Sequence, residues 1–180
     1  RYGTVLPLNE ECEYYFRLGL DNEEKFHRNQ KTYPQLIHEA LGLTYAGQRY
    51  ALTPTEADRA AAGVILERLG AGTNGLLIGL NPGAGNVFAN KAWRPDGYVR
   101  LIGDLPNRLF GVGFLMLGGP DETELIERIQ REAPGNRVFN PGTNNDLGTF
   151  AALIERCAVV VSGDTLAMHL ALAVGARSVA

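Results

Sequence analysis

Residues 158–169 read AVVVSGDTLAMH. Four apolar residues lead into a short polar turn, and an apolar-rich segment then runs from Thr165 to a glycine at position 175. This pattern predicts a buried strand, a tight turn and a helix. The first N–H groups of a helix have no partner within the helix, and the helix dipole gives that end a partial positive charge. The turn is therefore suited to holding a phosphate.

The alternation of apolar runs and helical patterns covers most of the chain beyond residue 75. We expect strands at Leu76–Leu80, Val112–Leu117, Arg137–Phe139 and Ala158–Val161, and a further strand from Ser178. We expect helices at Pro95–Leu109 (with a distorted end at Pro106), Glu122–Glu132, Asp146–Arg156 and Thr165–Val174. Near-continuous apolar strands separated by helices indicate a Rossmann-like, doubly wound parallel sheet in the α/β class. Ligands of such sheets bind beyond the carboxyl ends of the strands.

The first third of the chain is organised differently. Residues 1–52 are polar and aromatic with weak periodicity, and only Tyr33–Leu41 predicts a short helix. Residues 53–56 read TPTE, which fits a capping box with proline at the first helical position, and Gly70 is expected to end the helix that follows. We therefore place a domain boundary between residues 52 and 53.

Composition limits the classes of function. Apolar residues make up 45% of the chain and the net charge is −3, which suits a globular domain without a general attraction for nucleic acid or anionic lipid. Cys12 and Cys157 are the only cysteines, and we expect free thiols and a reducing compartment. The three histidines and two cysteines form no metal-binding motif, so no metal is expected.

A second glycine-rich turn follows the first predicted strand of the sheet. Residues 81–86 read NPGAGN, and Lys91 and Trp93 come shortly after them. Glycines in this place allow backbone N–H groups to approach an oxyanion, but the segment also fits an ordinary surface loop with a solvated lysine. The sequence GAGTNG at residues 70–75 matches GxGxxG, yet it precedes a strand instead of following one, so it is not a dinucleotide fingerprint.

Other polar residues near strand ends also have two interpretations. Asp164 is either a helix N-cap or a ligand-binding carboxylate, and His169 alone is most simply an ordinary histidine. Asp121 and Glu122, in the sequence GGPDE, either cap a helix or bind ribose hydroxyls. Residues 141–145, PGTNN, either contact a base or only turn.

Together these motifs resemble glycosyltransferase family nine, the ADP-heptose:lipopolysaccharide heptosyltransferases and their relatives. The resemblance rests on NPGAG at 81–85, KxW at 91–93, LGGPDE at 117–122 and SGDTLAMH at 162–169, in this order and with this spacing. It implies the C-terminal half of a two-domain GT-B fold, in which residues 1–52 end the N-terminal acceptor domain and residues 53–180 form a donor-binding domain truncated at its C-terminus.

The resemblance also implies roles for individual residues. Lys91 and Asp164 are the catalytic candidates, Lys91 by neutralising the diphosphate, and the base is expected in the N-terminal domain. Thr165 would help to hold the phosphates or the sugar, His169 would support that site, and Glu122 would meet the ribose. The complete donor-binding set is Asn81, Gly83, Ala84, Gly85, Lys91, Gly119, Glu122, Asp164, Thr165, Leu166 and His169.

The implied reaction is an inverting transfer of a sugar, heptose from ADP-heptose, to a lipopolysaccharide core or related glycan, without a cofactor. Its partners are the nucleotide-sugar donor and a glycolipid or glycan acceptor, and its place is the cytoplasm, with peripheral attachment to the inner membrane through the N-terminal domain. Leu166 departs from the glycine that many members have, which leaves the sugar open. Alternatives are another GT-B enzyme that uses a UDP-sugar, as a transferase or epimerase, and a non-catalytic nucleotide-sugar-binding domain.

Overall fold

The computed structural model describes residues 6–71, 75–83, 92–135 and 137–180. The chain divides into two compact units, residues 1–48 and 49–180. Each unit has its own buried residues, so each is described by itself. Among the described residues, no helix combines the length and the apolar character needed to cross a membrane.

The first unit is a small helical hairpin. It contains α1 (Glu10–Arg17), a π-helical turn (Glu24–Arg28) and α2 (Tyr33–Ala40), the last as the sequence predicts. Side-chain oxygens of Asn9 and Thr32 accept hydrogen bonds from backbone N–H groups at the starts of α1 and α2. Leu18 and Leu36 are buried, whereas most other apolar side chains of this unit are exposed.

The second unit begins with α3 (Glu56–Leu69), whose start differs from the prediction. The N-cap is Thr55, and its hydroxyl and backbone N–H pair with the backbone N–H and carboxylate of Asp58. Pro54 therefore precedes the N-cap instead of occupying the first helical position. The capping box that forms lies two residues later than predicted. Thr53 and Thr55 each have a carboxylate three residues ahead, Glu56 and Asp58, and the pair that forms is Thr55 with Asp58. Gly70 ends the helix with φ +63°, as expected.

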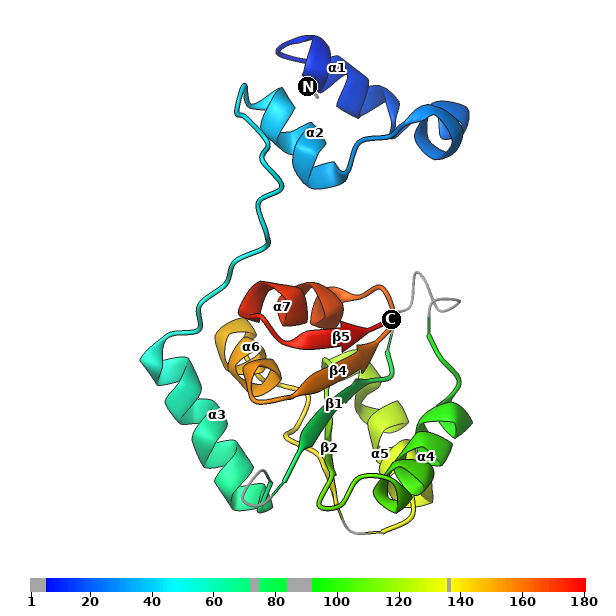
Figure 1. Ribbon diagram of the computed structural model, residues 1–180, viewed down its shortest axis with the longest axis vertical. Coiled ribbons are helices and arrows are strands. Elements are labelled where there is room, and N and C mark those ends of the chain that lie inside the picture. The colour runs from blue at the N-terminus through cyan, green and yellow to red at the C-terminus, as the bar shows by residue number, and fades with distance from the viewer. Residues whose placement is uncertain (1–5, 72–74, 84–91, 136) are drawn as a thin grey trace, which may run out of the picture. The chain divides into compact units, whose positions relative to one another are not determined.

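The sheet confirms the predicted doubly wound architecture. Its strands are β1 (Leu77–Asn81), β2 (Gly113–Met116), β3 (Val138–Phe139), β4 (Val159–Ser162) and β5 (Arg177–Val179). All pairs are parallel and the order is β3-β2-β1-β4-β5. Figure 1 labels β2, β1, β4 and β5, which follow one another in this order. From β1 the chain adds β2 and β3 on one side, and it then crosses over to add β4 and β5 on the other side. The order of strands therefore switches between β1 and β4, and a ligand site is expected outside the carboxyl ends of these two strands.

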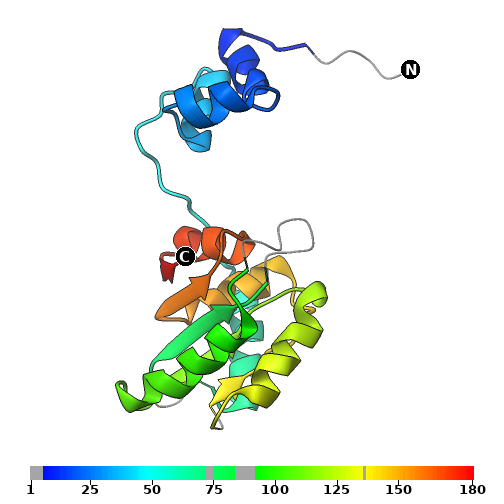
Figure 2. The same ribbon diagram turned by 90° about the vertical axis from the view of Figure 1, so that its right-hand side faces the viewer.

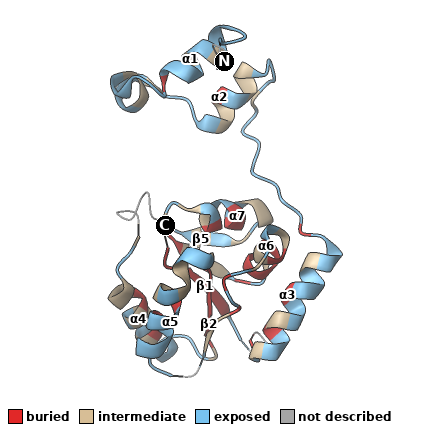
Figure 3. Ribbon diagram, turned by 180° about the vertical axis from the view of Figure 1, so that it is seen from behind, coloured by how far each residue is buried: buried red, intermediate tan, exposed pale blue. Residues whose placement is uncertain are grey.

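Helices cover both faces of the sheet (Figures 1 and 2). On one face, α4 (Pro95–Asp104) and α5 (Thr123–Glu132) pack on Leu80 and Met116. On the other, α3, α6 (Leu147–Glu155) and α7 (Leu166–Val174) pack on Leu115 and Leu117. The central strands β1 and β2 are fully buried, while the outer surfaces of the helices are exposed (Figure 3), which explains why these two strands are mainly apolar.

Helix α4 is shorter than its apolar pattern suggests. It ends at Asp104 and continues as a 3₁₀ turn, Leu105–Asn107, around Pro106. Proline lacks the N–H that a further helical turn requires and its ring crowds the preceding carbonyl, so the predicted distortion at this residue is confirmed.

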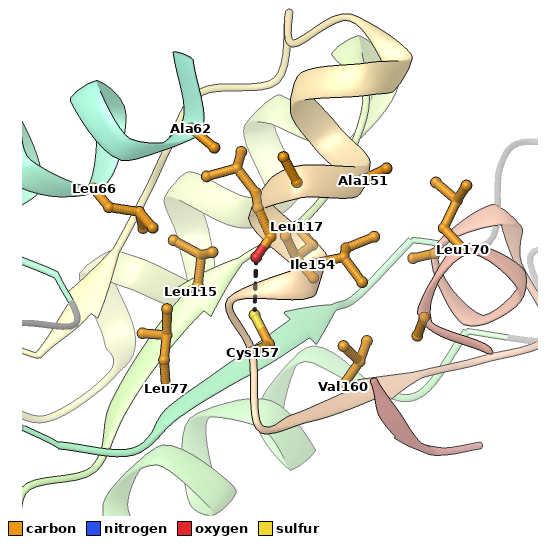
Figure 4. Packing of buried hydrophobic residues seen from close by; sticks show 14 of the residues in the cluster. Ala62, Leu66, Leu77, Leu115, Leu117, Ala151, Ile154, Cys157, Val160 and Leu170 are labelled. Carbon is orange, nitrogen blue, oxygen red and sulfur yellow. Dashed lines mark hydrogen bonds between the residues drawn. The ribbon is translucent and has the colours of Figure 1, made fainter. Parts of the chain in front are cut away.

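Cys157 is a buried free thiol in the core between the sheet and α6, as expected (Figure 4). Its Sγ contacts the carbonyl oxygen of Leu153 at 3.5 Å, and burial raises its pKa to about 12. Because only the thiolate is reactive, a thiol with this pKa is ionised to roughly one part in 10⁴ at pH 8.

Cys157 should therefore resist alkylation in the folded protein, whereas the half-buried Cys12 should react. Peptide mapping after brief iodoacetamide treatment at pH 8 measures this directly, and labelling in 6 M guanidinium, where both thiols should react, is the control. If iodoacetamide alkylated Cys157 in the folded protein as fast as it alkylates Cys12, the burial of Cys157 in the core would be contradicted.

Candidate functional site

A cavity of about 470 Å³ lies at the carboxyl ends of β1 and β4, where the sheet order predicts a ligand site. It is bounded by the ends of β1 and β2, the loop before α6, and the first residues of α6 and α7. The described residues that line it are Asn81, Gly83, Gly118, Gly119, Pro120, Glu122, Thr143, Asn145, Leu147, Phe150, Thr165, Leu166 and Ala167.

The structure brings together most of the predicted site residues that it describes. The cavity is lined by Asn81, Gly83, Gly119, Glu122, Thr165 and Leu166. Asp164 and His169 lie nearby in the same turn and helix but are not part of the lining. Ala84, Gly85 and Lys91 lie outside the described residues, so their roles remain predictions from the sequence.

Asn81 joins the elements that form the cavity floor. It is buried, and its Nδ2 donates to the carbonyl oxygen of Leu117 at 2.9 Å, beyond the end of β2. Its Oδ1 accepts from the hydroxyls of Ser162 at 3.1 Å and Thr165 at 3.0 Å. The hydroxyl of Tyr98, on α4, donates to the Asn81 carbonyl at 2.8 Å, and burial raises the Tyr98 pKa to about 12. One side chain thus connects β1, the end of β2, β4 and the start of α7.

Thr165 is the N-cap of α7, so the interpretation of Asp164 as the N-cap is wrong. The side chain of Thr165 forms no capping hydrogen bond with the helix, because its hydroxyl is turned toward Asn81 and Ser162. In α3 and α6, by contrast, Thr55 and Asp146 use their side chains as caps. The side chain of Thr165 therefore leaves the first N–H groups of α7 uncapped at the cavity wall, where an anion can accept hydrogen bonds from them.

Asp164 and His169 form a pair beside this helix start. Nε2 of His169 lies 3.5 Å from Oδ1 of Asp164, and both side chains are about half exposed. The ring of Tyr50 meets the His169 ring edge to face at 5.8 Å between centroids. The five-residue spacing thus brings the two groups together, and Tyr50 is a neighbour that sequence patterns did not indicate.

Glu122 and two glycines shape the opposite wall. The chain enters a 3₁₀ turn, Pro120–Glu122, and Oε2 of Glu122 accepts from the backbone N–H of Gly119 at 2.9 Å. The capping carboxylate here is that of Glu122, so the interpretation of Asp121 as an N-cap is wrong. A Cβ atom on Gly83 would overlap Cγ of Glu122, so the absence of a side chain at Gly83 lets this carboxylate sit against β1.

The rest of the lining comes from the loop before α6 and from α6 itself. Thr143 is buried, and its hydroxyl is 2.7 Å from that of Thr123. Asn145 donates to the carbonyl oxygen of Gly142 at 2.8 Å. These contacts place part of the PGTNN segment in the cavity. Leu147 and Phe150 were not expected here, because in sequence they belong to the apolar pattern of a helix.

The described wall is chemically mixed. Leu147 and Leu166 are 56% and 59% exposed and offer apolar surface, while Thr143, Asn145 and Glu122 offer hydrogen-bonding groups. Within the described part of the lining there is no lysine or arginine, so the positive potential that this part offers to an anion comes from the start of α7. In the same described ranges, no cluster of side chains could hold a metal ion. The wall suits an elongated ligand with a planar or apolar end, hydroxyls and an anionic group.

Known structures share this fold. E. coli ADP-heptose LPS heptosyltransferase II aligns with a TM-score of 0.64 and 20% identity over 77% of this chain and 41% of that one. A glycosyl transferase family 9 protein from Veillonella parvula aligns with a TM-score of 0.69 and 22% identity over 83% and 43%. E. coli heptosyltransferase WaaC with ADP-2-deoxy-2-fluoro heptose gives 0.52 and 23% over 84% and 45%. The chain thus spans less than half of each of these proteins, and the likeness confirms the C-terminal half of a GT-B fold.

No curated protein sequence matches this chain significantly. The model of glycosyltransferase family 9 (heptosyltransferase) matches residues 21–180, which include all of the described cavity lining. The chain therefore belongs to glycosyltransferase family 9.

Proposed function

We propose that residues 53–180 form the donor-binding domain of an inverting glycosyltransferase that uses a nucleoside diphosphate sugar, with heptose from ADP-heptose as the donor and a lipopolysaccharide core or related glycan as the acceptor. The observation that carries the proposal is the cavity at the switch between β1 and β4, into which α7 begins without a side-chain cap. One solved relative is described with ADP and with an ADP-heptose analogue, which supports the class of ligand.

The wall suggests how the donor is arranged. The diphosphate would lie against the start of α7 at Thr165, with Lys91 supplying the counter-charge that the described lining lacks. Oε1 of Glu122, which has no hydrogen-bond partner among the residues that the structure describes, would accept a ribose hydroxyl, since Oε2 already accepts from Gly119. The base would lie between the apolar side chains of Leu147 and Leu166 and the polar groups of Thr143 and Asn145.

In the proposed reaction, an acceptor hydroxyl loses its proton to a base outside residues 53–180. Its oxygen attacks the anomeric carbon of the donor, a C–O bond forms, and the bond from that carbon to the phosphate oxygen breaks. The nucleoside diphosphate leaves with the electron pair. The N–H groups at the start of α7, which are in place before the reaction begins, and the ammonium of Lys91 would stabilise the charge that develops on the leaving group.

Calorimetric titration of this chain with ADP, UDP and GDP tests the proposal. We expect ADP to bind and to bind more tightly than the other two, and we expect the chain alone to bind donor but transfer little sugar. Preference for UDP would favour the alternative GT-B transferase or epimerase. Failure of all three nucleotides to bind would contradict the assignment of the cavity, and binding of a nucleotide sugar by the intact enzyme without turnover would favour a non-catalytic domain.

A further inference from the structure

The hydroxyls of Ser162 and Thr165 form a pair behind the cavity wall. Their oxygens are 2.8 Å apart, and each lies within hydrogen-bond distance of Oδ1 of Asn81, at 3.1 Å and 3.0 Å. Asn81 and Thr165 line the cavity, whereas Ser162 is only 4% exposed and does not. Two hydroxyls of different accessibility thus share one buried acceptor.

The orientation of the Asn81 amide is fixed. Its Nδ2 donates to the carbonyl oxygen of Leu117, so Oδ1 must face the two hydroxyls. A buried carbonyl oxygen that lacks a hydrogen-bond donor is unfavourable. Oδ1 therefore requires at least one of the two hydroxyl hydrogens at all times.

Each hydroxyl has a single hydrogen to donate. If the hydroxyl of Thr165 donates to an oxygen of a ligand in the cavity, it leaves Oδ1 of Asn81. Ser162 is within reach of the same oxygen and can supply the replacement hydrogen without entering the cavity. Its alternative acceptor, the carbonyl oxygen of Gly163 at 2.9 Å, faces the same hydroxyl.

We propose that Ser162 is a positioning residue for ligand binding: its hydroxyl takes over the hydrogen bond to Asn81 when the hydroxyl of Thr165 turns to the phosphate of a bound nucleoside diphosphate. The exchange rests on the proposed function, since it needs an anionic ligand at the start of α7. It assigns to Ser162 a role in affinity although Ser162 does not touch the ligand.

The exchange predicts coupling between the two hydroxyls. In S162A, Thr165 is the one donor to Oδ1 of Asn81 among the described residues. Turning its hydroxyl to the ligand then leaves Oδ1 unsatisfied, and ADP should bind about tenfold more weakly. In T165V the competition no longer exists, so adding S162A should leave the reduced ADP affinity unchanged. T165S restores a hydroxyl at position 165, so in that background S162A should again weaken ADP binding.

The test is a calorimetric double-mutant cycle with ADP, using wild type, S162A, T165V, T165S and the two double variants, each checked for folding by urea denaturation. If S162A unfolds, S162C replaces it, because a thiol keeps the volume and is a weak donor. Equal ADP affinity in wild type and S162A, or an equal loss from S162A with and without the Thr165 hydroxyl, would overturn the exchange. Failure of the wild-type chain to bind ADP would instead contradict the proposed function, and the exchange with it.

Discussion

Asn81→Ala is expected to lower the free energy of unfolding by about 2–4 kcal/mol, the range of changes that break a buried hydrogen-bond network. The variant removes the donor to the Leu117 carbonyl and the acceptor shared by Ser162 and Thr165, and it leaves a small void at a residue that is 6% exposed. Urea denaturation followed by circular dichroism measures the change.

The consequences of Asn81→Ala should extend to the ligand site. Loss of Oδ1 removes the hydrogen bonds that tie Ser162 and Thr165 to β1, so the start of α7 is held less firmly in place. ADP affinity should therefore fall, even though the hydroxyl of Thr165 no longer has to leave Asn81 to reach the ligand. Asn107→Ala is the matched control, because its side chain is exposed and makes one long hydrogen bond of 3.4 Å to Gly103. We expect the control to change stability by less than about 0.5 kcal/mol. If Asn81→Ala and Asn107→Ala had the same free energy of unfolding, the hydrogen bonds of Asn81 would not be what connects β1 to its neighbouring strands and to α7.

The architecture was predictable because the central strands of the parallel sheet are covered by helices on both faces. Burial makes Leu77–Asn81 and Gly113–Met116 mainly apolar runs, which stand out between helices and turns. The errors lie at element ends. Helix α3 starts at Glu56 because the capping box forms between Thr55 and Asp58, although Thr53 and Glu56 offer the same spacing two residues earlier. The position of a helix start depends on a single pair of side chains, whereas the position of a strand is indicated by a whole run of apolar residues.

The candidate site was predictable only where glycines and polar residues follow a strand directly. Thr165 and Glu122 fit that rule and line the cavity. Leu147 and Phe150 do not, because their place depends on β3 and β4 lying on opposite sides of β1, which follows from strand order and not from any local pattern. The buried contacts of Asn81 likewise join residues 36 and 81 positions away, at Leu117 and Ser162.

Gly83→Ala is expected to weaken ADP binding by about 10–100-fold while the fold is retained. The new Cβ would overlap Cγ of Glu122, so the carboxylate must leave its position against β1 and give up its bond to Gly119. A hydrogen bond from a ribose hydroxyl to a carboxylate contributes about 1.5–3 kcal/mol, which corresponds to this range of affinity. Titration with ADP measures the loss.

Comparison of ADP with 2′,3′-dideoxy-ADP shows whether Gly83 acts through Glu122. The wild-type chain should prefer ADP, because only ADP has ribose hydroxyls for Glu122 to accept, and Gly83→Ala should bind the two nucleotides with similar affinity. Gly119→Ala is the matched control. Gly119 has an ordinary φ of −94°, and among the described atoms its Cβ would meet Oε2 of Glu122 alone, at an ordinary contact distance of 3.4 Å. It should keep the preference for ADP. If Gly83→Ala weakens both nucleotides equally, the added methyl group acts on another part of the ligand, and the ribose role of Glu122 is wrong.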